Sequence, residues 1–171
     1  MREKAAQILE ETKQDLLLQS PRLIEAFKEI VIGGKWEVEP PRTNKDVIYL
    51  EIEFGYKYDM YLYPMDHETE PIGGVSLLRN VMSNWATTNP KSMEEFDYDI
   101  PEDEQDLNEY HKLLKPYYMN WVADCFMQAG AADFDKDVFI MEHDGGKPFN
   151  LKTREQGWEF YPEAVEEEEE D

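Results

Sequence analysis

The first 34 residues carry apolar positions at helical spacing. In residues 1–18 the recurring positions are Ala5, Leu9, Thr12 and Leu16. Intervals of three and four residues are typical of an amphipathic helix. Ser20 followed by Pro21 is typical of a new helix start, because serine caps free N–H groups and proline fits the first turn. Apolar residues at helical spacing then continue to Gly33, so we expect two N-terminal helices.

After Pro41 the period of the apolar pattern changes to two. The apolar even positions are Ile48, Leu50, Ile52, Phe54, Tyr56, Tyr58, Met60 and Leu62. This alternation predicts strand with one apolar face. Its phase continues through Gly55, and only a loop with an odd number of residues preserves it. We expect a hairpin with a three-residue loop at 54–56, which sets Glu53 opposite Lys57. One long strand bent at a glycine bulge is the alternative.

The rest of the chain adds helices and short strands. Residues 75–85 space like a short helix, and residues 106–128 hold the strongest helical pattern, which Pro116 starts, kinks or divides. Alternating patterns then predict short strands at 138–141, 149–151 and 158–161. Helices and strands come in blocks, so the predicted class is α+β. It comprises two N-terminal helices, an antiparallel sheet with a central hairpin, one long amphipathic helix and short C-terminal strands.

Charge divides the chain into an ordinary body and two acidic segments. The 171 residues include 39 acidic and 17 basic side chains, which gives a formal net charge of -22. Residues 94–109 hold nine carboxylates and residues 163–171 hold seven, and neither segment has a cation. We expect a single domain over 1–162, with 94–109 as a docked loop, and a disordered acidic tail over 163–171.

The same composition excludes several functional classes. Nucleic acid, anionic lipid and polyphosphate are bound mainly through Lys and Arg, so strong negative charge disfavours them as direct ligands. No apolar stretch approaches the roughly 18 residues that a membrane helix needs. The single cysteine, Cys125, cannot form an internal disulfide. We therefore expect a cytoplasmic protein that is neither exported nor inserted in a membrane.

Cys125 is the one residue that suggests nucleophilic catalysis. A cysteine near a helix start, with a distant histidine such as His143, is how thiol hydrolases place their nucleophile. However, Cys125 continues the apolar stripe of the predicted helix at 106–128, where a free cysteine behaves as a small buried residue. We expect Cys125 to pack in the core.

Two arrangements suggest metal binding without meeting its requirements. Asp133, Asp135, Asp137 and Asp144 occupy positions 1, 3, 5 and 12 of a calcium loop, but Val138 replaces the glycine that the turn requires. His67 and His143 each lie among acidic residues, and they form a metal or general-base site only if the fold brings them together. We expect hydrogen-bonded surface histidines, and neither a metal nor a cofactor.

The C-terminal third contains a distinctive set of aromatic and turn residues. The set consists of the segment Trp121-Val122-Ala123-Asp124-Cys125-Phe126, Gly130, His143-Asp144-Gly145-Gly146, Phe149-Asn150-Leu151 and Trp158. It resembles small uncharacterised bacterial domains found among the immunity proteins of polymorphic toxin systems. The resemblance covers about 40 residues. It implies a non-enzymatic cytoplasmic inhibitor of a cognate toxin, with no catalytic residues.

The acidic segment at 94–109 supports the same kind of function. Carboxylates along a loop can occupy a cleft that binds phosphates, and aromatic residues among them can anchor the contact. We expect a non-catalytic binding protein that neutralises a basic partner, such as a toxin, a nuclease or a nucleic-acid-binding protein. The predicted partner-binding residues are Glu94, Glu95, Phe96, Asp97, Tyr98, Asp99, Glu102 and Asp103. Alternatives are a small hydrolase or metal-dependent enzyme that uses Cys125 and His143, and charge that serves solubility alone.

Overall fold

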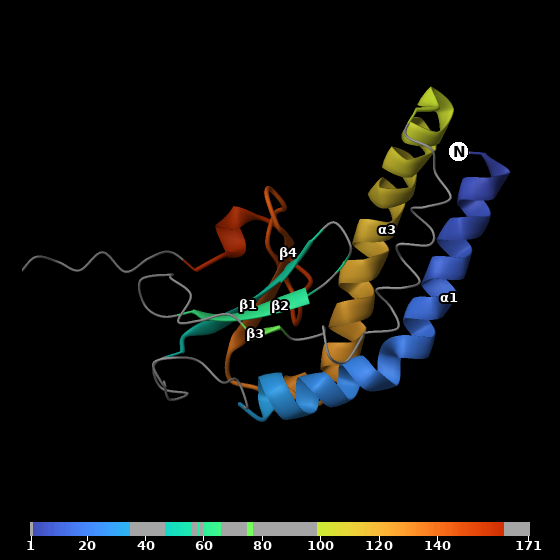
Figure 1. Ribbon diagram of the computed structural model, residues 1–171. Coiled ribbons are helices and arrows are strands. Elements are labelled where there is room, and N and C mark those ends of the chain that lie inside the picture. Colours follow the sequence, from blue (N-terminus) through green and yellow to red (C-terminus); the bar gives the residue numbers. More distant parts are fainter. Residues whose placement is uncertain are drawn as a thin grey trace, which may run out of the picture.

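The computed structural model describes residues 2–34, 47–55, 58, 60–65, 75–76 and 99–162. These residues form two layers, with long helices on one side of a mixed sheet (Figure 1). Helix α1 spans Glu3–Ala26 and continues directly into a π-helical segment, η1, at Phe27–Ile32. Helix α3 spans Pro101–Gln128. The predicted α+β class is confirmed.

The N-terminal segment is one α-helix followed by the π-helical turn, and not the two helices that the sequence suggests. Ser20 does not cap a new helix, because its hydroxyl bonds back to the carbonyl of Leu16 at 3.5 Å. The same oxygen accepts a hydrogen bond from the indole nitrogen of Trp121 at 2.9 Å. Pro21 lies within α1 and is exposed. A proline removes one N–H from the helix and favours bending, and α1 is bent around the core (Figure 1).

The sheet has five strands in the order β3-β2-β1-β4-β5. Their bounds are Tyr49–Phe54 (β1), Met60–Met65 (β2), Val75–Ser76 (β3), Asp137–Glu142 (β4) and Phe149–Asn150 (β5). Three pairs are antiparallel, but β1 and β4 are parallel. The prediction of an antiparallel sheet is therefore wrong at its centre. The connection from β1 to β4 includes α3, and a long helical crossover is what parallel pairing requires.

The hairpin of β1 and β2 has the predicted parity and a longer loop. Phe54 lies opposite Met60, so five residues separate the paired positions and Glu53 faces Tyr61, not Lys57. The odd loop keeps even positions opposite even positions, as the pattern predicts. The loop brings the side chain of Tyr58 into the core. Its ring stacks on that of Phe54 with centroids 5.6 Å apart, and its backbone is left-handed, with φ of 59°.

The sheet has two different faces. Even positions of β1, β2 and β4 join the main hydrophobic core, which also includes the buried residues of α1 and α3. Odd positions form a smaller cluster on the other face. That cluster consists of Tyr49, Met65 and Phe139, with Tyr63 and Tyr161 packed against it. Strand alternation thus separates the residues of the chain into two chemical environments.

Helices α1 and α3 run parallel to each other. Three contacts fix this direction, because Arg2 bonds to Asp106, the hydroxyl of Thr12 lies 2.9 Å from that of Tyr110, and Trp121 bonds to Ser20. Each contact lies farther along both helices than the one before it. The two N-terminal ends therefore lie side by side (Figure 1).

Three other expectations from the sequence are wrong within the described residues. Residues 75–76 form β3 against β2 and not the start of a helix. Residues 101–109 are the first turns of α3 and not a loop, and Pro116 lies within α3, so it neither starts nor divides the helix. Residues 158–160 form a 3-10 turn where a strand was expected. In the described part of the chain, no helix has an apolar stretch long enough to cross a membrane.

Candidate functional site

The parallel helices place an acidic cluster at their shared N-terminal end. Two of its carboxylates point inward and are buried, Asp103 and Asp106. Both bind Arg2, whose Nε lies 2.6 Å from Oδ2 of Asp106. The backbone N–H of Arg2 also bonds to Asp106 at 3.2 Å. The hydrogen bond from the guanidinium keeps the pKa of Asp106 below its ordinary value. This inner pair therefore holds the two helix ends together.

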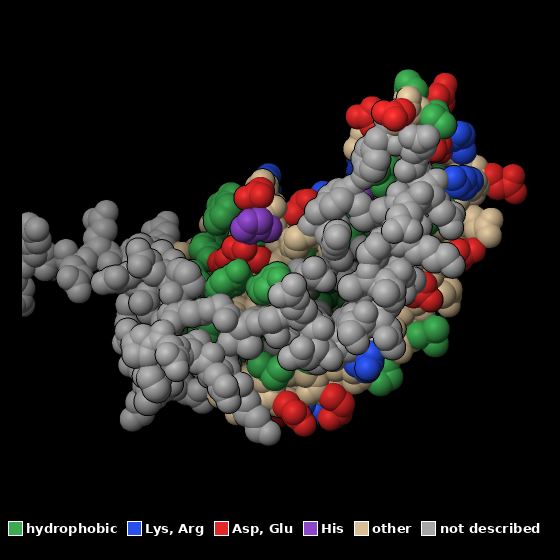
Figure 2. Space-filling view, in the orientation of Figure 1, with side chains coloured by type: hydrophobic (Ala, Val, Ile, Leu, Met, Phe, Trp, Pro, Cys, Tyr) green, Lys and Arg blue, Asp and Glu red, His purple; other side chains and the backbone are tan. Residues whose placement is uncertain are grey.

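Other acids at the same end face the solvent. Asp99, Glu102 and Glu104 are exposed, as is Glu3 at the start of α1. Figure 2 shows acidic side chains gathered at the end where α3 begins. Carboxylates are favourable there, because the N-terminal ends of two parallel helices carry partial positive charge. The acids at this end thus stabilise the two helices, whether or not they also bind a partner.

The predicted partner-binding residues consequently fall into three groups. Asp99 and Glu102 are exposed. Asp103 is 6% exposed, and its carboxylate is already occupied by Arg2. The remaining predicted residues lie outside the described residues, namely Glu94, Glu95, Phe96, Asp97 and Tyr98.

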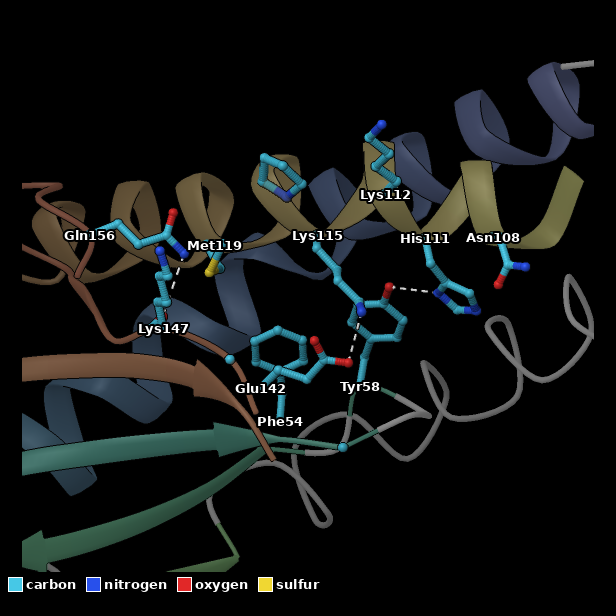
Figure 3. Close-up of a pocket in the computed structure, with 13 residues that line it drawn as sticks. Phe54, Tyr58, Asn108, His111, Lys112, Lys115, Met119, Glu142, Lys147 and Gln156 are labelled. Carbon is cyan, nitrogen blue, oxygen red and sulfur yellow. Dashed lines mark hydrogen bonds and ion pairs between the residues drawn. The ribbon is translucent and has the colours of Figure 1, made fainter. Parts of the chain in front are cut away.

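The described residues also form a pocket of about 560 Å³ where α3 meets the hairpin and the segment after β4. Phe54, Tyr58 and Met119 contribute its apolar surface. Its polar lining comes from Asn108, His111, Lys112, Lys115, Glu142, Lys147 and Gln156. Figure 3 shows Asn108, His111 and Lys115 extending from α3 toward the hairpin, whereas Lys112 extends outward from the helix.

Two polar contacts cross the pocket. Nζ of Lys115 forms an ion pair with Oε1 of Glu142 at 2.7 Å, which joins α3 to the end of β4. The hydroxyl of Tyr58 lies 3.0 Å from Nδ1 of His111. Burial, with a smaller effect of the neighbouring charge of Lys115, lowers the pKa of His111 to about 4. His111 is therefore neutral at physiological pH.

The turn that closes one wall of this pocket depends on glycine. Asp144 and Gly145 both have positive φ, at 66° and 134°, which reverses the chain after β4. At Gly146 an added Cβ would lie 2.6 Å from the backbone nitrogen of Glu142. Only glycine allows the turn to lie this close to the strand. The turn places Lys147 beside the pocket.

A buried carboxyl group lies on the opposite face of the sheet. Glu51 is 7% exposed and accepts a hydrogen bond from the hydroxyl of Tyr161. The hydroxyl of Tyr161 accepts a hydrogen bond from that of Tyr49 at 3.0 Å. Burial, together with the hydrogen bond to Glu53, raises the pKa of Glu51 to about 7. Tyr161 opposes this shift through its hydrogen bond. The carboxyl group of Glu51 therefore titrates near neutral pH.

His143 extends this cluster to the solvent. Its Nδ1 lies 2.7 Å from Oε2 of Glu53, and its Nε2 lies 3.5 Å from Oδ1 of Asp144. The hydrogen bond to Glu53 raises the pKa of His143 above its ordinary value. This agrees with the expectation of a hydrogen-bonded surface histidine. His67, the other residue of the hypothetical histidine site, lies outside the described residues.

The structure does not bring Cys125 and His143 together. Cys125 is 1% exposed and belongs to the core between the helices and the sheet. His143 binds Glu53, an odd position of β1, on the face that points away from the helices. Burial also raises the pKa of the Cys125 thiol to about 11, which suppresses the nucleophilic thiolate.

The aspartates of the hypothetical calcium loop are likewise dispersed. Asp133 ends the 3-10 turn η2 (Ala131–Asp133), Asp137 begins β4, and Asp144 lies in the following turn. Within the described ranges, no group of three or more His, Cys, Asp or Glu residues could hold a metal ion.

Sequence reasoning missed the pocket and the Glu51 cluster. One signal was present for the pocket, because Lys112 and Lys115 are three residues apart on a helix of an otherwise acidic chain. No pattern connects them with Lys147 or Tyr58. For Glu51 the sequence offered no signal, because the alternating pattern predicts that odd positions of the strand are exposed, whereas the structure buries Glu51.

Comparisons of the chain with protein-family models, with curated proteins and with solved structures found no significant match.

Proposed function

We propose that the protein is a non-catalytic binding protein that neutralises a basic protein partner with its acidic surface. The partner would be a toxin, a nuclease or another nucleic-acid-binding protein, and the protein would act as an inhibitor of the immunity type. The observation that supports this best is that the acids at the shared helix end are of two kinds, buried and paired with Arg2, or exposed. Buried Asp103 and Asp106 engage Arg2, while Asp99, Glu102 and Glu104 remain exposed.

This arrangement gives the exposed acids a rigid support. Glu102 and Glu104 lie on the first turn of a 28-residue helix that packs along α1. Fixed charges lose little side-chain and backbone freedom when a partner binds, so more of the electrostatic attraction appears as affinity. Long-range attraction between opposite charges also raises the association rate at low salt.

The sites considered for catalysis support a binding role over the alternative. A hydrolase built on Cys125 and His143 needs an accessible thiolate beside the imidazole. Here burial raises the pKa of the thiol, and the sheet lies between the two side chains. We therefore propose no catalytic residues.

The test compares two variants with the same change in net charge. The first is the triple variant Asp99→Asn, Glu102→Gln, Glu104→Gln at the helix end. The matched control is Glu29→Gln, Asp133→Asn, Asp135→Asn, at exposed acids near the other end of the helices. Each protein is used to capture partners from lysate of the source organism at low and high salt, and the recovered protein is purified for titration.

The proposal predicts a basic protein that binds the wild type and the control with similar Kd. The helix-end variant should bind at least about tenfold more weakly, with a shallower dependence on salt. Equal weakening in both variants would show a response to net charge alone and would overturn the assigned surface. Binding that survives high salt and both variants would exclude an electrostatic inhibitor.

A further inference from the structure

We propose that the pocket between α3, the hairpin and the turn after β4 binds a small organic acid, with a carboxylate joined to an apolar body. This goes beyond the proposed protein partner, and it concerns a different part of the surface. The pocket volume of about 560 Å³ falls within the range of small-molecule sites, which is roughly 300 to 1,000 Å³. A volume of this size accommodates one ligand of that kind together with a few waters.

The charge of the lining indicates an anionic ligand. Three lysines and one glutamate line the pocket, Lys112, Lys115, Lys147 and Glu142, and His111 is neutral. The lining is therefore positive in a chain whose net charge is -22. Of the three lysines, only Lys115 has an ion-pair partner among the described residues. Charges beyond about 10 Å are largely screened at physiological salt, so these nearby cations decide the local attraction.

The positions of these lysines suggest how a carboxylate would be held. Lys115 extends from α3 toward the hairpin, and its ammonium group meets the carboxylate of Glu142 (Figure 3). Lys147 comes from the segment after β4, and the side chain of Lys112 extends outward from α3. A carboxylate that enters between Lys115 and Lys147 would share or replace the contact of Lys115 with Glu142. Both groups of that ion pair are only about one-third exposed, so a bound anion would be partly shielded from water.

The rest of the lining indicates an apolar body on the same ligand. Pro116 offers exposed hydrocarbon surface and Met119 a small part of its side chain, whereas Phe54 and Tyr58 line the pocket but are almost fully buried. The amides of Asn108 and Gln156 supply hydrogen-bonding groups at the edge. Inorganic phosphate would leave this apolar surface in contact with water. A purely apolar ligand would cover the ammonium group of Lys147 without supplying a counter-charge, which is costly.

The test uses defined probes with the intact chain. Phenylacetate, indole-3-acetate and 3-methylbutanoate are each compared with the neutral amide of the same acid, and inorganic phosphate is included. Binding is followed by amide chemical shifts in ¹H–¹⁵N NMR spectra, which also report whether each variant is folded. The variant Lys115→Gln, Lys147→Gln removes two of the cations that line the pocket. The control, Lys28→Gln, removes one exposed lysine on η1 that does not line the pocket.

The expected result is saturable shifts around the pocket with at least one carboxylate, and affinity at least about tenfold weaker for its amide and for the double variant. Lys28→Gln should bind like the wild type. Equal binding of acid and amide would overturn the anionic part of the proposal, and tighter binding of phosphate would overturn the apolar part. Absence of shifts at the pocket with every carboxylate at about 10 mM would overturn the whole proposal.

Discussion

Arg2 and Asp106 lie 104 residues apart in the chain and are joined by two hydrogen bonds of 2.6 and 3.2 Å. One comes from the guanidinium Nε and the other from the backbone N–H of Arg2. The carboxylate of Asp106 therefore satisfies a free N–H group and a cation at the start of α1, from within α3. This contact fixes the relative position of two parallel helices at the end where their dipoles repel each other.

We predict that Asp106→Asn lowers the melting temperature by several degrees, because the amide loses the charge-assisted bonds to Arg2. Asp103→Asn should act in the same direction. The exposed neighbour Glu104→Gln is the control and should change the melting temperature little. In a double-mutant cycle with Arg2→Met, the effects of the Asp106 and Arg2 substitutions should be clearly less than additive. Full additivity would show that the contact contributes nothing to stability.

We predict that Glu51 makes the protein less stable as pH rises toward neutrality. Its folded pKa of about 7 lies above the ordinary value of 4.5. The folded state therefore binds the proton more tightly, so this contribution is fully present below pH 4.5 and is lost as pH rises through 7. The groups around Glu51 are Glu53, Tyr161 and Tyr63, with Tyr49 beyond Tyr161.

The variant Glu51→Gln tests the direction of this pH dependence, because glutamine keeps an oxygen acceptor for Tyr161 and carries no charge. At pH 8 its free energy of unfolding should exceed that of the wild type by about 1 to 3 kcal/mol, and near pH 4 the difference should disappear. Chemical denaturation at several pH values measures it. Glu155→Gln, at an exposed position, is the control. A variant less stable than the wild type at pH 8 would contradict the prediction.

We predict that the imidazole of His143 titrates above its ordinary pKa because it bonds to the carboxylate of Glu53. The variant Glu53→Gln should lower the pKa of His143, since the first and largest cause of the shift is removed. NMR titration of the histidine ring protons measures both values. The ring of His111 serves as an internal reference, because burial lowers its pKa to about 4. An unchanged His143 titration in the variant would disprove the contact.

We predict that Cys125 reacts with thiol reagents only after unfolding. With a pKa of about 11, roughly one thiol in ten thousand is ionised at pH 7, and the side chain is buried. Modification by a disulfide reagent should therefore be slow in the native protein and fast in denaturant. Cys125→Ala should cost about 1 to 2 kcal/mol through lost packing and should leave any partner binding intact. Rapid modification of the folded protein would reopen a nucleophilic role.

We predict that Ser20→Ala destabilises the protein by about 1 kcal/mol, because the indole N–H of Trp121 loses its acceptor. Ser20→Thr keeps the hydroxyl and is the matched comparison. Tryptophan fluorescence during chemical denaturation measures both variants. If alanine and threonine change the free energy of unfolding equally, the hydrogen bond from Trp121 to Ser20 does not contribute the predicted value of about 1 kcal/mol.

The local pattern of the sequence determined the secondary-structure elements better than it determined how they are arranged in space. Helical spacing indicated helix in the first 34 residues and in the long C-terminal segment, and alternation at even positions indicated β1 and β2 with an odd loop between them. These signals depend on neighbours within one or two turns, which the sequence specifies directly. Local capping signals misled at Ser20 and Pro21, because Trp121, 101 residues away, binds the serine and keeps α1 continuous.

The tertiary structure alone decided which distant residues share an environment. Parallel pairing of β1 with β4 put Glu51 and Glu53 on one face with Tyr161 and His143, and left Cys125 on the other. The pocket likewise combines Lys115 on α3, Lys147 after β4 and Tyr58 from the hairpin loop. Such contacts depend on chain direction and long-range packing, for which a single sequence carries no periodic signal. The sequence by itself therefore determined the amount and sign of the charge, whereas folding determined which charges are buried, paired or exposed.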